Sequence, residues 1–292
     1  MRLLFVHAHP DDESLWTGLS LAAFAAAGDD VHVLTCTLGE EGEVIPPGLA
    51  HLEGAPGDPL GPHRLGELRV ATAHLGVQSR LLAPAWAPDR PWYRDSGMAG
   101  SAAARHPRAF AGAPLPEVAD RVRAVITELR PAVVVTYDQA GGYGHPDHIR
   151  CHDAVVAAVR GIPVHQRPLT YAVLTPQSWA REDRRWLAAA DLPGDWTVLS
   201  DPGSYPPSVV PDEVVTHATV APEQVATQAE ALRAHETQVI VTDGAWALSN
   251  LEAGRLSGRE GFALINVDTG ALVTSPLGVP DPPRKVLGDG RH

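Results

Sequence analysis

Short apolar runs alternate along the chain with longer segments in which apolar residues recur every three or four positions. The uninterrupted apolar runs at 3–6, 31–34 and 132–135 predict strands that are buried on both faces. Helical spacing of apolar residues predicts helices over about 15–26, 65–75, 118–129 and 147–159. Because strands and helices alternate, we expect an α/β fold with a doubly wound, mainly parallel sheet and helices on both faces.

The rest of the chain has a weaker pattern. Strands are predicted near 169–174 and 214–219, and a helix follows over about 222–235. Two stretches without periodicity, 36–62 and 83–113, are rich in Gly and Pro. Loops of that length in a compact domain usually form functional walls or lids, so we expect both to border an active site.

Composition and charge exclude several classes of protein. Of the 292 residues, 44% are hydrophobic and 20% are charged, which is typical of a globular rather than a disordered chain. The 23 Lys+Arg against 35 Asp+Glu give a net charge of −12, which disfavours a nucleic-acid partner. No apolar run approaches the roughly 18 residues that span a membrane, and 1–6 is too short for a secretory signal, so we expect a cytoplasmic protein. No feature indicates an oligomeric state.

Two clusters of histidines and carboxylates follow predicted strands. The sequence HAHPDDE at 7–13 follows the first strand, and YGHPDH at 143–148 follows the strand at 132–135 after a short glycine-rich loop. In an open parallel sheet, ligands bind beyond the carboxyl ends of the strands. We therefore expect the two clusters to meet in space, although they are far apart in the sequence.

The residue types in these clusters are those of a catalytic metal site. A catalytic zinc ion takes three protein ligands from His, Asp and Glu and leaves one position for water. His9 and Asp12 can bind one ion from a single turn, and His148 can complete the set. Asp11 can then take a proton from the metal-bound water, whose pKa the ion lowers to about 7. Ferrous iron fits two histidines and one aspartate as well as zinc does.

His145 and Tyr143 are expected to face the same cavity, where they can stabilise a developing oxyanion or protonate a leaving amine. Simpler interpretations exist for each cluster alone. Acidic residues at 11–13 favour the start of a helix, and His145-Pro146 can mark a helix start. The metal hypothesis is stronger, because so many imidazoles and carboxylates at two strand ends would repel one another without a cation.

With these motifs the chain resembles the zinc-dependent deacetylases of the LmbE-like (PIG-L) superfamily. Within it, the resemblance is to the mycothiol-pathway deacetylases that act on N-acetylglucosaminyl-inositol. The supporting segments are TCTLGEEGEV at 35–44, RLGEL at 64–68, RDSGMAG at 94–100, AHETQ at 234–238 and LSN at 248–250. The resemblance implies one Rossmann-like deacetylase domain over 1–275, in which 161–275 forms a smaller C-terminal part of the pocket, and an irregular tail at 276–292.

The resemblance also implies roles for individual residues. It assigns the zinc ion to three ligands, His9, Asp12 and His148. It makes Asp11 the general base, His145 a general acid or electrostatic partner, Tyr143 an oxyanion contact, and Asp147 the residue that orients His145. Four further positions fall where the family contacts the sugar and the inositol, namely Glu43, Arg64, Asp95 and Met98.

The expected protein is a zinc-dependent hydrolase that removes the acetyl group from N-acetylglucosaminyl-inositol, a small-molecule amino-sugar substrate. The alternatives are a mycothiol S-conjugate amidase and a deacetylase of another N-acetyl amino sugar or an antibiotic intermediate. The segments at 40–44 and 95–98 favour the first function over the amidase. A non-catalytic sugar-binding module would be expected to have lost Asp11 or a ligand, and all are present. A nucleotide-binding Rossmann enzyme is disfavoured, because no Gly-x-Gly-x-x-Gly follows the first strand.

Four other residues have simpler explanations. Cys36 and Cys151 exclude a disulfide framework and a Cys-based zinc module, and we interpret both as small buried residues. His7 is interpreted as a buried, hydrogen-bonded structural histidine. For His235, which lies at the end of the predicted C-terminal helix, entry into the pocket stays open.

Overall fold

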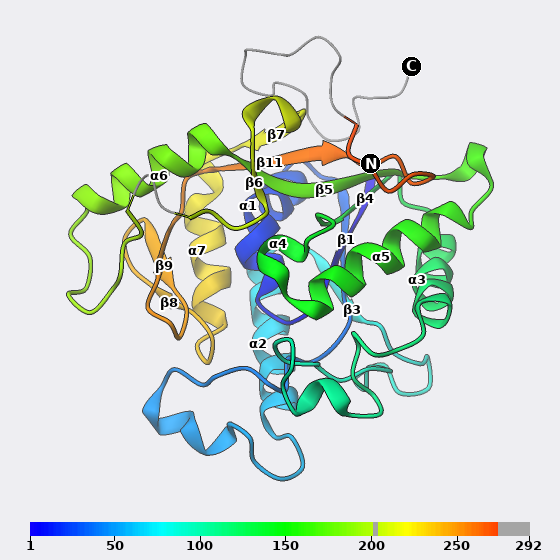
Figure 1. The fold of residues 1–292 in the computed structure, drawn as a ribbon, viewed down its shortest axis with the longest axis horizontal. Helices are drawn as coiled ribbons and strands as arrows, with labels where there is room; N and C mark the ends of the chain where they lie inside the picture. Colours follow the sequence, from blue (N-terminus) through cyan, green and yellow to red (C-terminus); the bar gives the residue numbers. More distant parts are fainter. Residues whose placement is uncertain (201–203, 274–292) are drawn as a thin grey trace.

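The computed structural model describes residues 1–200 and 204–273. Its main sheet contains β1 (Arg2–His7), β2 (Asp30–Thr35), β3 (Gln78–Leu81), β4 (Val133–Tyr137), β5 (Leu169–Pro176), β6 (Val209–Val210), β7 (His217–Val220) and β11 (Arg259–Leu264). The strand order is β3-β2-β1-β4-β5-β11-β7, and the first five of these strands run parallel (Figure 1). The expected mainly parallel α/β sheet is confirmed.

Beyond β5 the sheet becomes antiparallel, because β11 pairs antiparallel with both β5 and β7, while short β6 pairs parallel with the end of β5. The strand predicted near 214–219 corresponds to β7. The sequence pattern does not predict β3, whose first two residues are exposed at the edge of the sheet, or β11. A second, antiparallel sheet contains β8 (Ile240–Val241), β9 (Ala245–Ala247) and β10 (Ala253–Arg255).

Helices cover both faces of the main sheet (Figure 1). They are α1 (Asp12–Ala26), α2 (Leu60–Leu75), α3 (Leu115–Leu129), α4 (Gly141–Gly144), α5 (Pro146–Arg160), α6 (Gln177–Ala189) and α7 (Val225–Ala234). Short 3-10 turns occur at Pro47–Leu52, Ala103–Arg105, Val164–Gln166, Asp212–Val214 and Pro222–Gln224. The pattern does not predict α6, of which only Arg184 and Leu187 are buried. None of these helices, all within the described residues, is long and apolar enough to cross a membrane.

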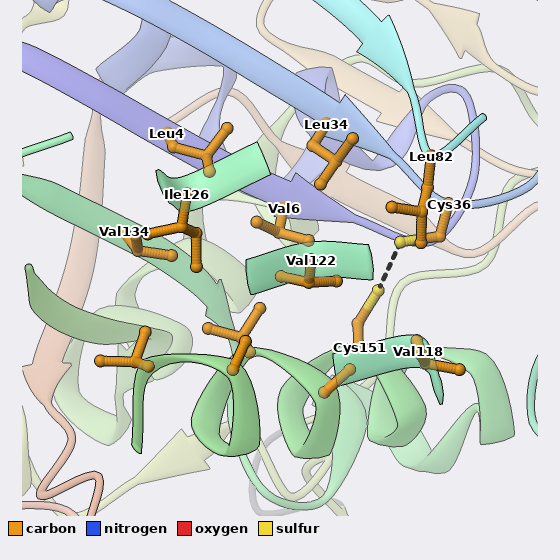
Figure 2. Packing of buried hydrophobic residues seen from close by; sticks show 14 of the residues in the cluster. Leu4, Val6, Leu34, Cys36, Leu82, Val118, Val122, Ile126, Val134 and Cys151 are labelled. Atoms are coloured by element: carbon orange, nitrogen blue, oxygen red, sulfur yellow. Dashed lines mark hydrogen bonds between the residues drawn. The ribbon is translucent and has the colours of Figure 1, made fainter. Parts of the chain in front are cut away.

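Alternate side chains of β1 enter two hydrophobic cores. Leu4 and Val6 pack with α3 and α5 on one face (Figure 2), and Leu3 and Phe5 pack with α1, α2 and α7 on the other. All four side chains are fully buried, which explains why the strand has no polar alternation. Burial of each such side chain stabilises the fold by roughly 1.5–3 kcal/mol. The two cores fix the carboxyl end of β1, from which the first polar cluster continues.

The structure describes the two cysteines and His7 but not the predicted tail. Cys36 and Cys151 are buried free thiols in the first core, with their Sγ atoms 3.5 Å apart (Figure 2). His7 is fully buried, and its Nε2 atom lies 2.9 Å from the hydroxyl oxygen of Thr17, as expected of a structural histidine. The predicted irregular tail at 276–292 lies outside the described residues.

Candidate active site

The carboxyl ends of β1 and β4 bring the two histidine-rich clusters together. These strands are parallel neighbours, and Phe5 pairs with Val135. After β1 the chain turns directly into α1, and after β4 it passes through α4 into α5 (Figure 1). Both clusters therefore lie at one edge of the sheet, as the sequence predicts, and both help to line a cavity of about 920 Å³.

Three side chains that the sequence predicts as metal ligands lie in contact with one another. The Nδ1 atom of His9 lies 3.2 Å from Oδ2 of Asp12 and 3.4 Å from Nε2 of His148. That Nε2 atom lies 3.4 Å from Oδ1 of Asp12, and all three side chains are buried. Ligand atoms at about 2.0–2.1 Å from a tetrahedral zinc ion are separated from one another by about 3.3 Å. Each of the three pairwise distances is close to this value, with one oxygen of Asp12 facing His9 and the other facing His148.

The imidazole of His9 is held by carboxylates through its other nitrogen. Its Nε2 atom lies 3.3 Å from Oδ2 of Asp147 and 3.4 Å from Oδ1 of Asp95. A metal-binding histidine commonly donates its second ring N–H to a carboxylate, which fixes the ring and its tautomer. Although burial lowers the pKa of His9, the surrounding carboxylates, Asp95 first, raise it well above its ordinary value. The carboxylates around His9 therefore favour positive charge at this position.

The carboxylate of Asp147 contacts His9, and only its backbone N–H contacts His145. It accepts the backbone N–H groups of Ser96 over 2.9 Å and Ala111 over 3.1 Å, and these bonds from the second long loop hold it in place. Toward His145, Asp147 presents its backbone N–H, which donates to Nδ1 over 3.2 Å. The loop thus reaches the metal position through Asp147 and His9.

Asp11 has a strained backbone beside the metal position. Its φ of 110° and ψ of −34° are rare for a residue with a side chain, and such strain costs about 1–3 kcal/mol. Asp11 lines the cavity, and its Oδ2 atom accepts from Nη2 of Arg64 over 3.0 Å. Burial, opposed by Arg64 and assisted by Asp12, raises the pKa of Asp11 to about 7. A carboxylate with such a pKa can both accept and return a proton in one turnover.

Arg64 lines the cavity, but its guanidinium group is bound to the protein. The residue is 3% exposed and donates to the carbonyl oxygens of Gly39, over 2.6 Å, and of Pro10 as well as to Asp11. A side chain at Gly39 would place its Cβ 1.9 Å from Nη1 of Arg64, and the φ of +64° there also requires glycine. Arg64 therefore connects the first long loop to Asp11.

His145 lies against both histidine ligand candidates. Its ring centroid is 4.7 Å from that of His9 and 4.9 Å from that of His148. The three histidines also have ring nitrogens within 4.8 Å of one another, so they form a group that could hold one ion. Burial, followed by the charges of His9 and His148, lowers the pKa of His145 to about 3. The metal-free ring is therefore neutral at pH 7. Because Nδ1 accepts the N–H of Asp147, we assign the ring proton to Nε2, which makes that atom a hydrogen-bond donor.

Tyr143 lines the cavity and is exposed. Its ring is nearly parallel to that of Trp16, at 8°, with the centroids 6.4 Å apart. A Cβ atom at Gly142, where φ is +75°, would lie 2.6 Å from the Trp16 ring, so glycine allows the loop to pack there. Trp16 is therefore a site residue that motif reasoning misses, since an aromatic residue on a helix is usually a core residue.

The four predicted substrate contacts differ in position. Three of them line the cavity, namely Arg64, Asp95 and Met98. The side chain of Glu43 is exposed and is not among the lining residues, whereas its neighbours Glu41 and Gly42 are. The structure therefore does not bring Glu43 to the cavity as predicted, because the turn of the first long loop directs Glu41 there instead.

His235 does not enter the cavity. It is fully buried, and its Nε2 atom lies 2.7 Å from Oε1 of Glu13, which is also fully buried. Burial opposes the charge on both residues, but Glu13 raises the pKa of His235 and His235 lowers the pKa of Glu13. The two side chains therefore form a buried pair in which each favours the charged form of the other. The three adjacent carboxylates at 11–13 are the sequence signal for this pair, because a buried carboxylate needs a partner within the protein.

Residues from the second half of the chain line the rest of the cavity. We call this part the C-terminal wall, and its large side chains are Trp179, Trp246, Arg255 and Arg259. Both arginines pair with Asp183 of α6 over 3.0 Å. Sequence reasoning missed these residues, because they come from α6 and from short strands that carry no motif.

Known proteins are similar to this chain. Residues 4–159 match the family model of PIG-L, GlcNAc-PI de-N-acetylase. The chain is 48% identical over 255 residues to a 1D-myo-inositol 2-acetamido-2-deoxy-alpha-D-glucopyranoside deacetylase of Actinosynnema mirum, which covers 85% of this chain and 86% of the relative. The chain belongs to the PIG-L de-N-acetylase family.

Further known proteins are similar to this PIG-L family member. A protein of Rhodococcus opacus with the same name is 45% identical over 274 residues, covering 90% of this chain and 91% of the relative. Among solved structures, a deacetylase of teicoplanin biosynthesis is 23% identical with a TM-score of 0.54, covering 94% of this chain and 99% of that one. The N,N'-diacetylchitobiose deacetylase of Pyrococcus horikoshii is 18% identical with a TM-score of 0.51, and the match covers 83% of this chain and 72% of that one. These structures have the same fold.

Proposed function

We propose that this PIG-L family member is an amide hydrolase that removes the acetyl group from N-acetylglucosaminyl-inositol in mycothiol biosynthesis. Relatives that are 42–48% identical over most of the chain are named for that activity. The observation that carries the proposal is the convergence of His9, Asp12 and His148 beside the carboxylate of Asp11. A cytoplasmic location stays a prediction.

We propose zinc as the cofactor, held by His9, Asp12 and His148, with ferrous iron as the alternative that the same donors fit. When bound, such an ion acts as a Lewis acid that activates water and polarises an amide carbonyl group. The two nitrogen donors and one carboxylate leave the charge of the ion only partly neutralised. The support of His9 by Asp147 and Asp95 resembles that of metal-binding histidines in general.

The protein groups supply the proton transfers of the proposed reaction. Asp11 accepts a proton from the attacking water, which adds to the acetyl carbonyl carbon. Tyr143 and Nε2 of His145 donate hydrogen bonds to the oxyanion that forms. Protonated Asp11 then returns its proton to the sugar nitrogen as the C–N bond breaks, which releases acetate and the free amine, while neutral His145 acts as the electrostatic partner. Arg64 orients the Asp11 carboxylate throughout.

Arg64, Asp95 and Met98 are proposed to contact the sugar hydroxyls or ring, because they line the cavity beside the metal position. The alternatives are an amidase of mycothiol S-conjugates and a deacetylase of another N-acetyl sugar or an antibiotic intermediate. All three functions use the same catalytic groups, so they differ in what the C-terminal wall accommodates.

A substrate panel tests the proposal. Purified enzyme loaded with one zinc ion per chain is assayed with N-acetylglucosaminyl-inositol, free N-acetylglucosamine and a mycothiol S-conjugate. We expect the highest kcat/KM for the first, since a site that binds hydroxyl groups rejects analogues that lack them. A higher kcat/KM for the S-conjugate would support the amidase instead. If no N-acetyl sugar released acetate despite bound zinc, a non-catalytic sugar-binding module would be the better explanation.

A further inference from the structure

The strained backbone of Asp11 is fixed at each of its polar groups. Its carbonyl oxygen accepts the N–H groups of Ser14, over 3.0 Å, and Leu15, over 2.9 Å, which form the first turn of α1. Its carboxylate is held by Arg64. Its backbone N–H donates to Oε2 of Glu13 over 3.0 Å. A non-glycine residue keeps such a conformation only where the surrounding structure holds it.

Glu13 in turn needs partners of its own, because it is fully buried. A carboxylate taken out of water is costly unless it is paired and hydrogen-bonded. Its Oε1 atom accepts the hydroxyl of Ser14 over 2.6 Å and lies 2.7 Å from Nε2 of His235. Its Oε2 atom is then the one that receives the N–H of Asp11. The contact with His235 therefore sets the orientation of Glu13, and with it the hydrogen bond from the backbone N–H of Asp11.

His235 is well placed to set that orientation. It follows the last residue of α7, which packs beside α1 (Figure 1). Its own backbone is fixed, because its N–H donates to Leu232 and its carbonyl oxygen accepts from Gln238 and Val239. It is fully buried and does not line the cavity. His235 therefore acts on the site from behind, through its contact with Glu13 and through its charge, which lowers the pKa of Asp11.

From these contacts we infer that Glu13 and His235 form a positioning pair, which holds the backbone of Asp11 so that its carboxylate is directed to the substrate amide. The inference deepens the proposed function, since it rests on Asp11 acting as the base. The pair connects the C-terminal helix α7 to the catalytic turn. Its loss should reduce kcat rather than substrate binding, because neither side chain touches the cavity.

The test compares His235→Ala in the wild-type and Asp11→Asn backgrounds of the full-length, metal-loaded enzyme. In the wild-type background we expect kcat to fall about 10–100-fold, the usual range for groups that support a site residue, while KM and metal content stay the same. In the Asp11→Asn background the same substitution should have no further effect on kcat, because the group that it positions is already lost. His217→Gln, which changes a buried histidine of β7, is the matched control and should leave kcat unchanged.

Thermal melting and metal analysis accompany each variant, so that a folding defect is recognised. If His235→Ala does not fold, His235→Gln is measured in both backgrounds, with a smaller loss of kcat expected in the first only. An unchanged kcat in the folded variant, or an equal loss in both backgrounds, overturns the positioning role. If Asp11→Asn alone keeps wild-type kcat, Asp11 is not the general base, and the proposed function is wrong in that assignment.

Discussion

The region around the metal position and the C-terminal wall line the same cavity but are built differently. Around the metal position, His9, Asp12 and His148 are buried, and each is held by side chains from other elements. In the C-terminal wall, Arg255 and Arg259 pair with Asp183, whose side chain is 22% exposed, and behind the wall with Glu182, whose side chain is 54% exposed. Exposed pairs of this kind contribute about 0–1 kcal/mol each.

The difference indicates a division of labour between the two halves of the chain. Buried groups that are held from several sides keep one geometry, as proton transfer and metal binding require. The side chains of the C-terminal wall are held by partly exposed ion pairs on α6 and short strands, so this wall is suited to set substrate choice. The family model covers 4–159, which includes the metal position and excludes the C-terminal wall. The following predictions test this division.

Loss of a proposed metal ligand should have the largest effect. His148→Ala removes one of three donor atoms, and we expect the protein to lose stoichiometric metal and more than about 10⁴-fold of its acetate release, beyond what loss of a general base alone costs. Metal content by mass spectrometry and turnover are measured together. His152→Gln, one turn later on α5, is the control and should keep the metal. Zinc binding of unchanged affinity in His148→Ala would remove that residue from the ligand set.

Loss of the support behind a ligand should have a smaller effect. Asp147→Ala removes one acceptor from Nε2 of His9 and leaves Asp95, so we expect metal affinity to fall about 10–100-fold. Competition with a chelator measures the affinity, and Asp153→Ala on the same helix is the control. Equal affinity in both variants would show that Asp147 does not hold the ligand.

A change in the C-terminal wall should alter selectivity without touching the metal. Trp179→Ala should reduce kcat/KM for N-acetylglucosaminyl-inositol on the order of tenfold, about 1.4 kcal/mol of binding free energy, and leave free N-acetylglucosamine nearly unaffected. Trp86→Ala changes an 82% exposed tryptophan of the second long loop and should have no effect on either substrate. Equal losses on both substrates would place Trp179 among the groups that act on the acetamide end.

The junction of the two regions should show the smallest effect, on stability. Glu260 of β11 accepts the backbone N–H groups of Leu19 and Ser20 of α1 over 2.9 Å each, and burial raises its pKa from 4.5 to about 7. Because the pKa is higher in the folded state, this group lowers the free energy of unfolding as pH rises from about 4.5 to about 7. We expect Glu260→Gln to flatten that part of the melting-temperature profile by a few degrees at most. An identical pH dependence in the variant would contradict the assignment.

The sequence predicts the region around the metal position better than it predicts the C-terminal wall. His9 and Asp12 lie on one turn after an apolar strand, and His148 begins a helix after another, so local spacing and the rules of parallel sheets bring them together. The bonds of Asp147 to Ser96 and of Arg64 to Gly39 join separate loops, and no local pattern specifies them.

For the fold as well, the sequence predicts the elements that carry a clear local pattern. Strands buried on both faces, such as β1 and β4, are evident as apolar runs, whereas β3 and α6 bury little and leave no clear signal. The pairing of His235 with Glu13 joins α7 to α1 and depends on how the two helices pack.

The measurement that tests the central claim most directly is acetate release from N-acetylglucosaminyl-inositol by Asp11→Asn at equal zinc content. The amide keeps the shape of the carboxylate but cannot accept the proton. We predict one zinc ion per chain, a wild-type melting temperature within a few degrees, and a kcat lower by about 10²–10⁴-fold. A correctly folded, zinc-loaded Asp11→Asn enzyme with near wild-type kcat would contradict the account.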